Sequence, residues 1–282
     1  MLELVEEHRC FDGVQRIYRH ESQTIGLPMR FSVFLPARAS SGKVPALFYL
    51  AGLTCTEETF PIKAGAQRYA AEHGIALIAP DTSPRGADIP GETDAWDFGV
   101  GAGFYVDATR EPWAVRYRMY SYVTQELRET VVSALPVRED RIGIFGHSMG
   151  GHGALVLALR NPELYRSVSA FAPIAVPSQC PWGVKAFSGY LGDDRDTWKQ
   201  YDASELIKGD AARRFEGGIL VDQGLADQFL AEQLHPDVFE RNAREAGHEV
   251  TVRRHEGYDH GYFFISTFVG EHVAHHARVL CL

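Results

Sequence analysis

The chain has 282 residues, 45% of them hydrophobic and 23% charged, which is the balance of a globular protein with enough apolar material for a large core. Its formal net charge of −9 argues against nucleic acid and anionic membrane surfaces as partners. The start, MLELVEEHRC, lacks the basic and apolar regions of a signal peptide, and no run approaches the roughly 18 apolar residues of a membrane span.

In chain order, short apolar runs alternate with segments of helical spacing. We predict strands at 30–36, 45–51, 75–80, 142–145, 168–173, 218–224 and 249–254, and helices at 63–73, 119–135, from 152 onward, 230–246 and 263–280. Gly74 is placed as the C-cap of the first helix, and Pro236 either kinks the 230–246 helix or starts a new one. Two stretches, 82–113 and 174–192, lack a clear period, and we interpret them as irregular, functional segments.

Strands that alternate with helices predict a mostly parallel central sheet with helices on both faces. No repeat, linker or low-complexity segment interrupts the pattern. We therefore expect residues 1–282 to form a single α/β domain.

The pentapeptide Gly146-His147-Ser148-Met149-Gly150 lies between a predicted strand and a predicted helix. A G-x-S-x-G in this context is a nucleophile elbow, in which the serine is exposed on a sharp, strained turn of the α/β-hydrolase fold. The helix N-terminus that follows favours negative charge at that point. Ser148 is therefore the predicted nucleophile.

A serine hydroxyl needs a base and a group that orients the base, and in this fold they follow in the order Ser, acid, His. His260 follows the last predicted strand, and Asp227 follows the strand before it. Asp222 and Asp259 are weaker alternatives for the acid, because Asp222 lies within a strand and Asp259 adjoins the base.

Two other histidines lie close to the nucleophile in the sequence. His147 adjoins it, and we expect its side chain to line the pocket or to pack. His152 is on the predicted helix, where a structural role is favoured.

The oxyanion of the transition state requires two donors directed at the developing charge. The N–H of Met149, directly after the nucleophile, is one candidate. The other comes from the loop after the 45–51 strand and is assigned to the N–H of Leu53, with Thr54 adjacent.

Metal chemistry has little support in the sequence. His272, His275 and His276 recur at helical spacing near the C-terminus, but no carboxylate or thiol completes a site, and a solvated helix face is our interpretation. The four cysteines lack C-x-x-C spacing, which predicts reduced thiols in a cytoplasmic protein rather than disulfides or structural zinc. We therefore predict no metal site.

Long runs along nearly the whole chain resemble the signature sequences of the S-formylglutathione hydrolases, also called the esterase D family. These runs are Gly52–Thr56, Lys63–Arg68, Ala95–Gly99, Gly101–Thr109, Gly146–Leu155, Cys180–Gly183, Lys185–Gly192, Asp222–Gly224 with Asp227, and Tyr258–His260. The resemblance implies hydrolysis of S-formylglutathione to glutathione and formate in formaldehyde detoxification, with side activity on small esters. It also implies no cofactor and a homodimer.

The resemblance assigns the same roles to Ser148, Asp227, His260, Leu53 and Met149 as the residues themselves suggest. We further expect 83–113 and 180–182 to wall the substrate pocket. Candidate substrate contacts are Thr54, Cys55, His147, Trp182 and Gln228. Lys63 and Arg85 are alternatives for binding a glutathione carboxylate, although a solvated or structural charge is the favoured interpretation of both.

Two rival functions stay open at this point. One is a general small-acyl carboxylesterase or acyltransferase with the same triad. The other is a non-catalytic binding protein of the same fold, which the complete set of Ser, Asp and His disfavours.

Overall fold

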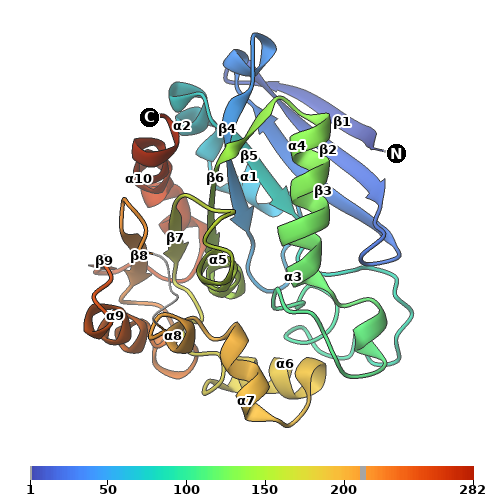
Figure 1. Ribbon diagram of the computed structural model, residues 1–282, viewed down its shortest axis with the longest axis vertical. Coiled ribbons are helices and arrows are strands. Elements are labelled where there is room, and N and C mark those ends of the chain that lie inside the picture. The colour runs from blue at the N-terminus through green and yellow to red at the C-terminus, as the bar shows by residue number, and fades with distance from the viewer. Residues whose placement is uncertain (1, 210–213) are drawn as a thin grey trace.

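The structure is a computed structural model that describes residues 2–209 and 214–282. Within these residues the centre is a nine-stranded sheet in the order β1-β2-β3-β5-β4-β6-β7-β8-β9 (Figure 1). The first strands pair antiparallel, and β3 also pairs antiparallel with β5, whereas every pair from β5 through to β9 is parallel. The strands are β1 (Glu3–Cys10), β2 (Gly13–Glu21), β3 (Pro28–Leu35), β4 (Val44–Leu50), β5 (Ala76–Pro80), β6 (Val137–His147), β7 (Val168–Phe171), β8 (Ile219–Gly224) and β9 (Val250–His255). The predicted, mostly parallel sheet is confirmed.

The inner parallel strands are apolar because helices cover both of their faces. β5 is buried along its whole length. In β6 the buried part runs from Ile142 to His147 and contains the apolar run from which a strand was predicted. The strand itself begins earlier, at buried Val137, and the charged residues 138–141 that follow it interrupt the apolar signal.

The helices form two layers around the sheet (Figure 1). On one face α2 packs against α10, which lies along β4, β6, β7 and β8; on the other, α5 packs against β6, β7 and α8, and α8 against α9. The helices are α1 (Thr59–Lys63), α2 (Ala66–His73), α3 (Met119–Ser121), α4 (Arg128–Ala134), α5 (Met149–Arg160), α6 (Pro181–Leu191), α7 (Arg195–Trp198), α8 (Ala203–Leu206), α9 (Pro236–Glu245) and α10 (Tyr262–Leu280). Of the helices in residues 2–209 and 214–282, none combines the length and apolarity needed to cross a bilayer.

The N-terminal hairpin of β1 and β2 was not predicted. No residue of β1 is buried, so its side chains show no alternation of apolar and polar types. The pairing of its backbone with β2 is what makes it a strand, and this pairing leaves no pattern in the sequence.

The interpretation of 174–192 as irregular is wrong at its C-terminal half, where α6 forms. The helix begins with Pro181 in its first turn, and the sulfur of Cys180 accepts a hydrogen bond from the N–H of Gly183. Gly183 and Gly189 lie within this helix and weaken its apparent propensity. Both are tightly packed, since a Cβ on Gly183 would lie 2.0 Å from the carbonyl oxygen of Pro177. By contrast, residues 82–112 contain isolated bridges but no helix or strand, as predicted.

Three helix boundaries depend on left-handed backbone. Gly65, at φ 67°, separates α1 from α2, so the predicted 63–73 helix begins only at Ala66, and α1 is an unpredicted helix before it. Gly74, at φ 69°, caps α2, as predicted, and its N–H bonds to carbonyls of the last turn. His235, at φ 49°, precedes α9, so Pro236 starts a new helix rather than kinking an old one.

The interpretation of His272, His275 and His276 as a solvated helix face is wrong, because all three are buried on the side of α10 that faces the sheet. Nδ1 of His272 lies 2.8 Å from the hydroxyl of Ser169. The His276 ring lies between two hydroxyls, with Nδ1 2.6 Å from Ser167 and Nε2 2.9 Å from Ser169. Two serine hydroxyls, from Ser169 in β7 and from Ser167 just before it, thus supply hydrogen-bond partners that the sequence of α10 does not reveal. Across the part of the chain that the structure describes, no group of three His, Cys, Asp or Glu side chains has the arrangement of a metal site.

Candidate active site

Ser148 occupies the turn between β6 and α5 with φ 57° and ψ −119°. The expectation of an exposed serine is wrong, because Ser148 is 3% exposed and packs against the loop at Gly52. A residue with a side chain rarely adopts such a conformation, and it persists only where the surroundings hold it. The N–H of Ser148 donates to the carbonyl of Phe171, and its own carbonyl accepts from His152 and Ile174. Backbone hydrogen bonds on both sides therefore fix the strained turn.

The glycines of the pentapeptide are required by close backbone packing. A Cβ atom on Gly150 would lie 1.9 Å from the carbonyl oxygen of Leu50, at the end of β4. A Cβ atom on Gly146 would lie 2.2 Å from the carbonyl oxygen of Gly150. Both distances are impossible, so only glycine allows β4, β6 and the first turn of α5 to meet at Ser148.

Asp227 and His260 lie together after β8 and β9. Nδ1 of His260 is 2.5 Å from Oδ2 of Asp227, whose carboxylate is buried. The carboxylate also accepts hydrogen bonds from the N–H of Phe229 at 2.8 Å and from the amide of Gln223 at 3.2 Å. A carboxylate on Nδ1 holds the proton on that nitrogen and leaves Nε2 as the basic one.

The alternative acids are engaged elsewhere. Asp222 accepts two hydrogen bonds from Arg253, both at 2.6 Å, and lies 3.3 Å from Nε2 of His272. Burial by itself would raise the pKa of Asp222, but the hydrogen bonds from His272 and Arg253 hold it well below its ordinary value. Asp259 accepts from the N–H of Gly261 within its own turn.

His147 packs against the proposed base. The two ring centroids are 4.4 Å apart, and His147 is 6% exposed. Within the described residues neither ring nitrogen of His147 has a hydrogen-bond partner. Burial, with a smaller contribution from His260, lowers the pKa of His147 well below its usual value, so its ring is neutral. The contact places the His260 ring beside the residue that precedes Ser148.

His152 is fully buried, and its Nε2 lies 3.0 Å from the carbonyl oxygen of Phe104, a structural position.

The loop after β4 contacts the nucleophile directly. A Cβ atom on Gly52 would lie 3.2 Å from the Cβ of Ser148. The N–H of Cys55 donates to the carbonyl of Gly52, and Thr54 has φ 69°, which together describe a type II turn. In the described part of the chain the N–H of Leu53 has no acceptor, whereas the N–H of Thr54 donates to Gly101.

Met149 is the first residue of α5, so the helix does not use its N–H. The structure therefore offers two backbone donors near Ser148, at Leu53 and Met149.

A row of aromatic rings leads from His260 to the surface. Phe229 lies edge-on to His260 at 5.0 Å between centroids, Trp182 contacts Phe229 at 4.7 Å, and Trp96 contacts Trp182 at 5.5 Å. Trp182 is 7% exposed and Trp96 55% exposed. Neither Phe229 nor Trp96 was singled out from the sequence; Phe229 follows Asp227 by two positions, which is the only signal for it there.

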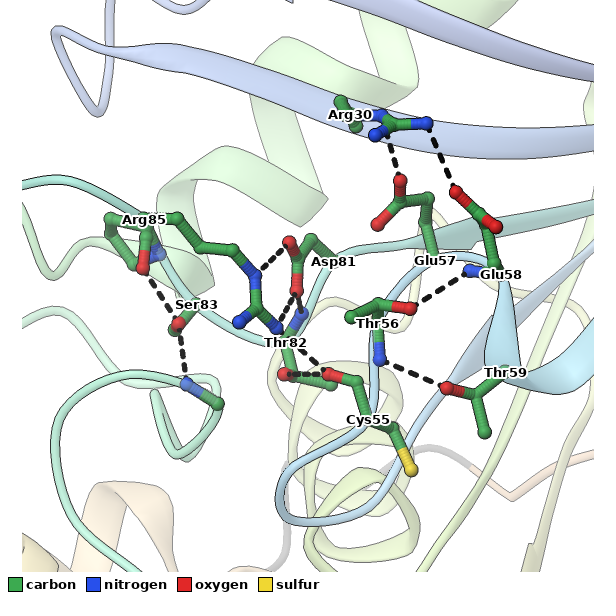
Figure 2. Close-up of polar contacts among 12 residues, drawn as sticks. Arg30, Cys55, Thr56, Glu57, Glu58, Thr59, Asp81, Thr82, Ser83 and Arg85 are labelled. Carbon is green, nitrogen blue, oxygen red and sulfur yellow. Dashed lines mark hydrogen bonds and ion pairs between the residues drawn. The ribbon is translucent and has the colours of Figure 1, made fainter. Parts of the chain in front are cut away.

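The remaining substrate candidates differ in exposure. Thr54 and Gln228 are exposed, whereas Cys55 is half-buried. Burial raises the pKa of the Cys55 thiol, so the sulfur is a poor thiolate and a weak candidate for nucleophile. Lys63 lies over the ring of Tyr262 at 5.7 Å. Arg85 forms a two-bond ion pair with Asp81, at 2.6 and 2.9 Å, which agrees with the favoured structural charge (Figure 2).

Comparisons with known proteins agree with this geometry. The family model named Esterase matches residues 22–275. An S-formylglutathione hydrolase of Mus musculus is 55% identical over 280 residues, covering 99% of both chains. One of Paracoccus denitrificans is 51% identical over 278 residues, covering 99% of this chain and 98% of its own. A solved structure of an S-formylglutathione hydrolase from Agrobacterium tumefaciens has a TM-score of 0.95 at 45% identity and covers 98% of this chain and 99% of its own.

The resemblance noted in the sequence therefore holds over nearly the full length, and the fold is that of the α/β hydrolases. The relatives are about half identical over the whole chain, and the site contains the serine elbow and the paired carboxylate and histidine of a serine esterase. The chain therefore belongs to the S-formylglutathione hydrolase family of esterases.

Proposed function

We propose that this chain hydrolyses S-formylglutathione to glutathione and formate through an acyl-enzyme on Ser148. The observation that carries the proposal is the contact between Asp227 and His260 beside the Ser148 elbow, in a chain whose relatives bear that name. The substrate suits the site, because a formyl group needs little room and a thiolate leaves readily.

In the proposed mechanism His260 accepts the proton of Ser148 at Nε2 as the hydroxyl oxygen attacks the thioester carbonyl. Asp227 stabilises the imidazolium that forms, and the N–H groups of Leu53 and Met149 donate to the oxyanion. The tetrahedral intermediate expels the glutathione thiolate, which takes the proton from His260. Water, activated by the same histidine, then attacks the formyl ester and releases formate and free Ser148.

Several further points belong to this proposal. The unbroken sheet supports a single domain over residues 1–282. A homodimer and a place in formaldehyde catabolism follow from the family resemblance alone, and a cytoplasmic location follows from the spacing of the four cysteines.

The test is steady-state hydrolysis of S-formylglutathione compared with p-nitrophenyl acetate. We expect kcat/KM to favour the thioester by orders of magnitude. Comparable or better turnover of the simple ester would favour a general carboxylesterase with the same triad.

Replacing Trp182 with Ala tests the proposed pocket wall. Trp182 supports Phe229, which packs on His260, and it also meets Trp96 at the surface. We expect KM for S-formylglutathione to rise several-fold more than KM for p-nitrophenyl acetate, because only the larger substrate reaches the aromatic row. An equal effect on both substrates would contradict a substrate contact. The variant Trp96→Ala is measured alongside, because truncating an exposed ring has little effect on packing and so tests substrate contact with less disturbance of the fold.

A further inference from the structure

We propose that Thr82, Arg85 and Asp81 are positioning residues that fix the turn at residues 52–55, and so direct the N–H of Leu53 toward the reacting carbonyl. None of the three touches the catalytic groups described above. The inference rests on the proposed function in one respect, namely that the Leu53 N–H serves as an oxyanion donor.

Two donors hold the carbonyl oxygen of Cys55, the last residue of the turn (Figure 2). The hydroxyl of Thr82 donates to it at 2.6 Å, and Nη2 of Arg85 donates at 3.2 Å. Thr82 is fully buried, so its hydroxyl has little alternative to this carbonyl. Side chains from the loop after β5 thus set the orientation of the peptide unit that directly follows the turn, between Cys55 and Thr56.

Asp81 holds both of these donors in place. Asp81 is 5% exposed, and its carboxylate accepts two hydrogen bonds from Arg85, at 2.6 and 2.9 Å, and one from the N–H of Thr82 at 2.7 Å. A planar guanidinium bound through two atoms to a carboxylate has one fixed orientation. Asp81 thus fixes the plane of the Arg85 guanidinium, and this orientation directs Nη2 at the carbonyl of Cys55.

A second set of contacts holds the middle of the turn. The hydroxyl of Ser83 accepts from the N–H of Gly101 at 2.8 Å, and the carbonyl of Gly101 accepts from the N–H of Thr54 at 2.9 Å. A Cβ atom on Gly101 would lie 3.0 Å from the Cα of Thr54, so the two backbones are in close contact. Residues 81–83 thus reach the turn from both sides.

The far end of the loop is anchored independently. Arg30, on β3, forms ion pairs with Glu57 at 2.8 Å and with Glu58 at 3.0 Å (Figure 2). Thr56 and Thr59 bond to each other through the N–H of Thr56 and the hydroxyl of Thr59 at 3.0 Å.

The turn needs such support because Thr54 is strained. A β-branched residue at φ 69° is a clear outlier, and such a conformation persists only when its neighbours over-determine it. The direction of the Leu53 N–H depends on this turn, and an oxyanion donor is effective only within a narrow range of positions. Loosening the Cys55 carbonyl is therefore expected to reduce stabilisation of the transition state without changing binding of the substrate.

The experiment uses Thr82→Val and Arg85→Met, which remove one donor each, with Thr82→Ser and Arg85→Lys as conservative variants. Kinetics are measured with p-nitrophenyl acetate and with S-formylglutathione, and the inhibition constant of a methyl trifluoromethyl ketone reports affinity for an oxyanion adduct. We expect kcat to fall about tenfold in Thr82→Val and in Arg85→Met on both substrates, a fraction of what loss of a whole oxyanion donor costs. KM should stay within about twofold, and the ketone should bind more weakly by the same factor as kcat falls. Thr82→Ser should recover nearly full activity, and Arg85→Lys part of it.

Arg138 provides a matched control. Its guanidinium forms the same kind of two-bond pair, with Asp140, on an exposed surface of β6. Arg138→Met should leave kcat, KM and ketone inhibition unchanged. Thermal unfolding of every variant shows whether a fall in kcat comes from unfolding or from displacement of the Leu53 N–H. If Thr82→Val or Arg85→Met does not fold, the inference is tested with Thr82→Ser and Arg85→Lys.

Two results would overturn the inference. One is an unchanged kcat in folded Thr82→Val and Arg85→Met. The other is a rise in KM for S-formylglutathione alone in Arg85→Met, which would make Arg85 a direct contact of a glutathione carboxylate. An error in the proposed substrate can be told apart from an error in this inference. If the substrate is wrong, the parent hydrolyses p-nitrophenyl acetate but not S-formylglutathione. The ester kinetics and the ketone inhibition then still measure how the variants affect the 52–55 turn. A parent that neither hydrolyses the ester nor reacts with a fluorophosphonate would overturn the proposed mechanism and this inference together.

Discussion

Replacing Ser148 with Ala is expected to lower kcat on S-formylglutathione and on p-nitrophenyl acetate by about 10⁴-fold or more. Loss of the nucleophile removes the acyl-enzyme route, and in serine hydrolases this costs between roughly 10⁴ and 10⁶ in kcat. KM should change little, because the side chain is short. A fluorophosphonate, which labels an activated serine, should modify the parent and fail to modify the variant.

Ser266→Ala is the matched control for this experiment. Its hydroxyl donates only within α10, to the carbonyl of Phe263, and it lies on the helix that follows the proposed base. Full activity and labelling in this variant, with loss of both in Ser148→Ala, would assign the chemistry to the elbow. Retained labelling in Ser148→Ala would disprove the assignment of the nucleophile.

Asp227→Asn should be the second most damaging substitution, with a fall in kcat of about 10⁴-fold on both substrates. An amide in this position donates a hydrogen bond to Nδ1 of His260, so the ring proton moves to Nε2. Nε2 can then no longer accept the proton of Ser148. The fold should be retained, since the change is nearly isosteric. The measurement is steady-state kinetics with thermal unfolding of the same preparation.

Asp222→Asn gives the opposite result if the assignment is correct. This carboxylate is paired with Arg253 and His272, away from His260, so kcat should stay within a few-fold. Stability should fall by about 1.5–3 kcal/mol, because Arg253 loses its two hydrogen bonds to the buried carboxylate and keeps only its ion pair with Glu271. Urea unfolding measures this loss. A variant at Asp222 that unfolds normally but has lost activity would reverse the roles of the two aspartates.

The pH dependence of the Asp222 contribution has a definite sign. Its pKa is lower in the folded protein than in the unfolded chain, where it is about 3.9. The stabilisation is therefore complete above about pH 4–5 and is lost as the pH falls below that range toward the folded pKa. In Asp222→Asn the loss of stability in acid should be correspondingly smaller.

The sequence predicted the parts of the fold that depend on burial and on glycine. The inner strands are buried on both faces and therefore read as apolar runs, and the elbow requires glycines at Gly146 and Gly150 that no other residue can replace. β1 and the histidines of α10 were missed or misjudged for one reason. Their roles depend on partners distant in the chain, which are β2 for the strand and Ser167 and Ser169 for the histidines.

The candidate site divides in the same way. The order of Ser148, Asp227 and His260 along the chain follows from the order of the parallel strands, so it could be predicted. Phe229 and Trp96 could not be predicted, because what connects them to His260 is a series of ring contacts in the folded chain and not a sequence motif. Arg85 could be judged a structural charge but not assigned to Cys55, since the loops after β4 and β5 meet only in three dimensions.

The histidines enclosed in this fold also couple its unfolding to proton uptake. Burial lowers the pKa of each member of a set that comprises His147, His152, His272, His275 and His276. Burial favours the neutral form of each ring inside the protein, whereas in the unfolded chain each ring is half protonated near pH 6.5. Each therefore reduces stability by up to about 1.4 kcal/mol per pH unit between its unfolded and folded pKa. Mild acidification is therefore expected to destabilise this protein, and its unfolding near pH 6 is expected to be accompanied by proton uptake at these histidines.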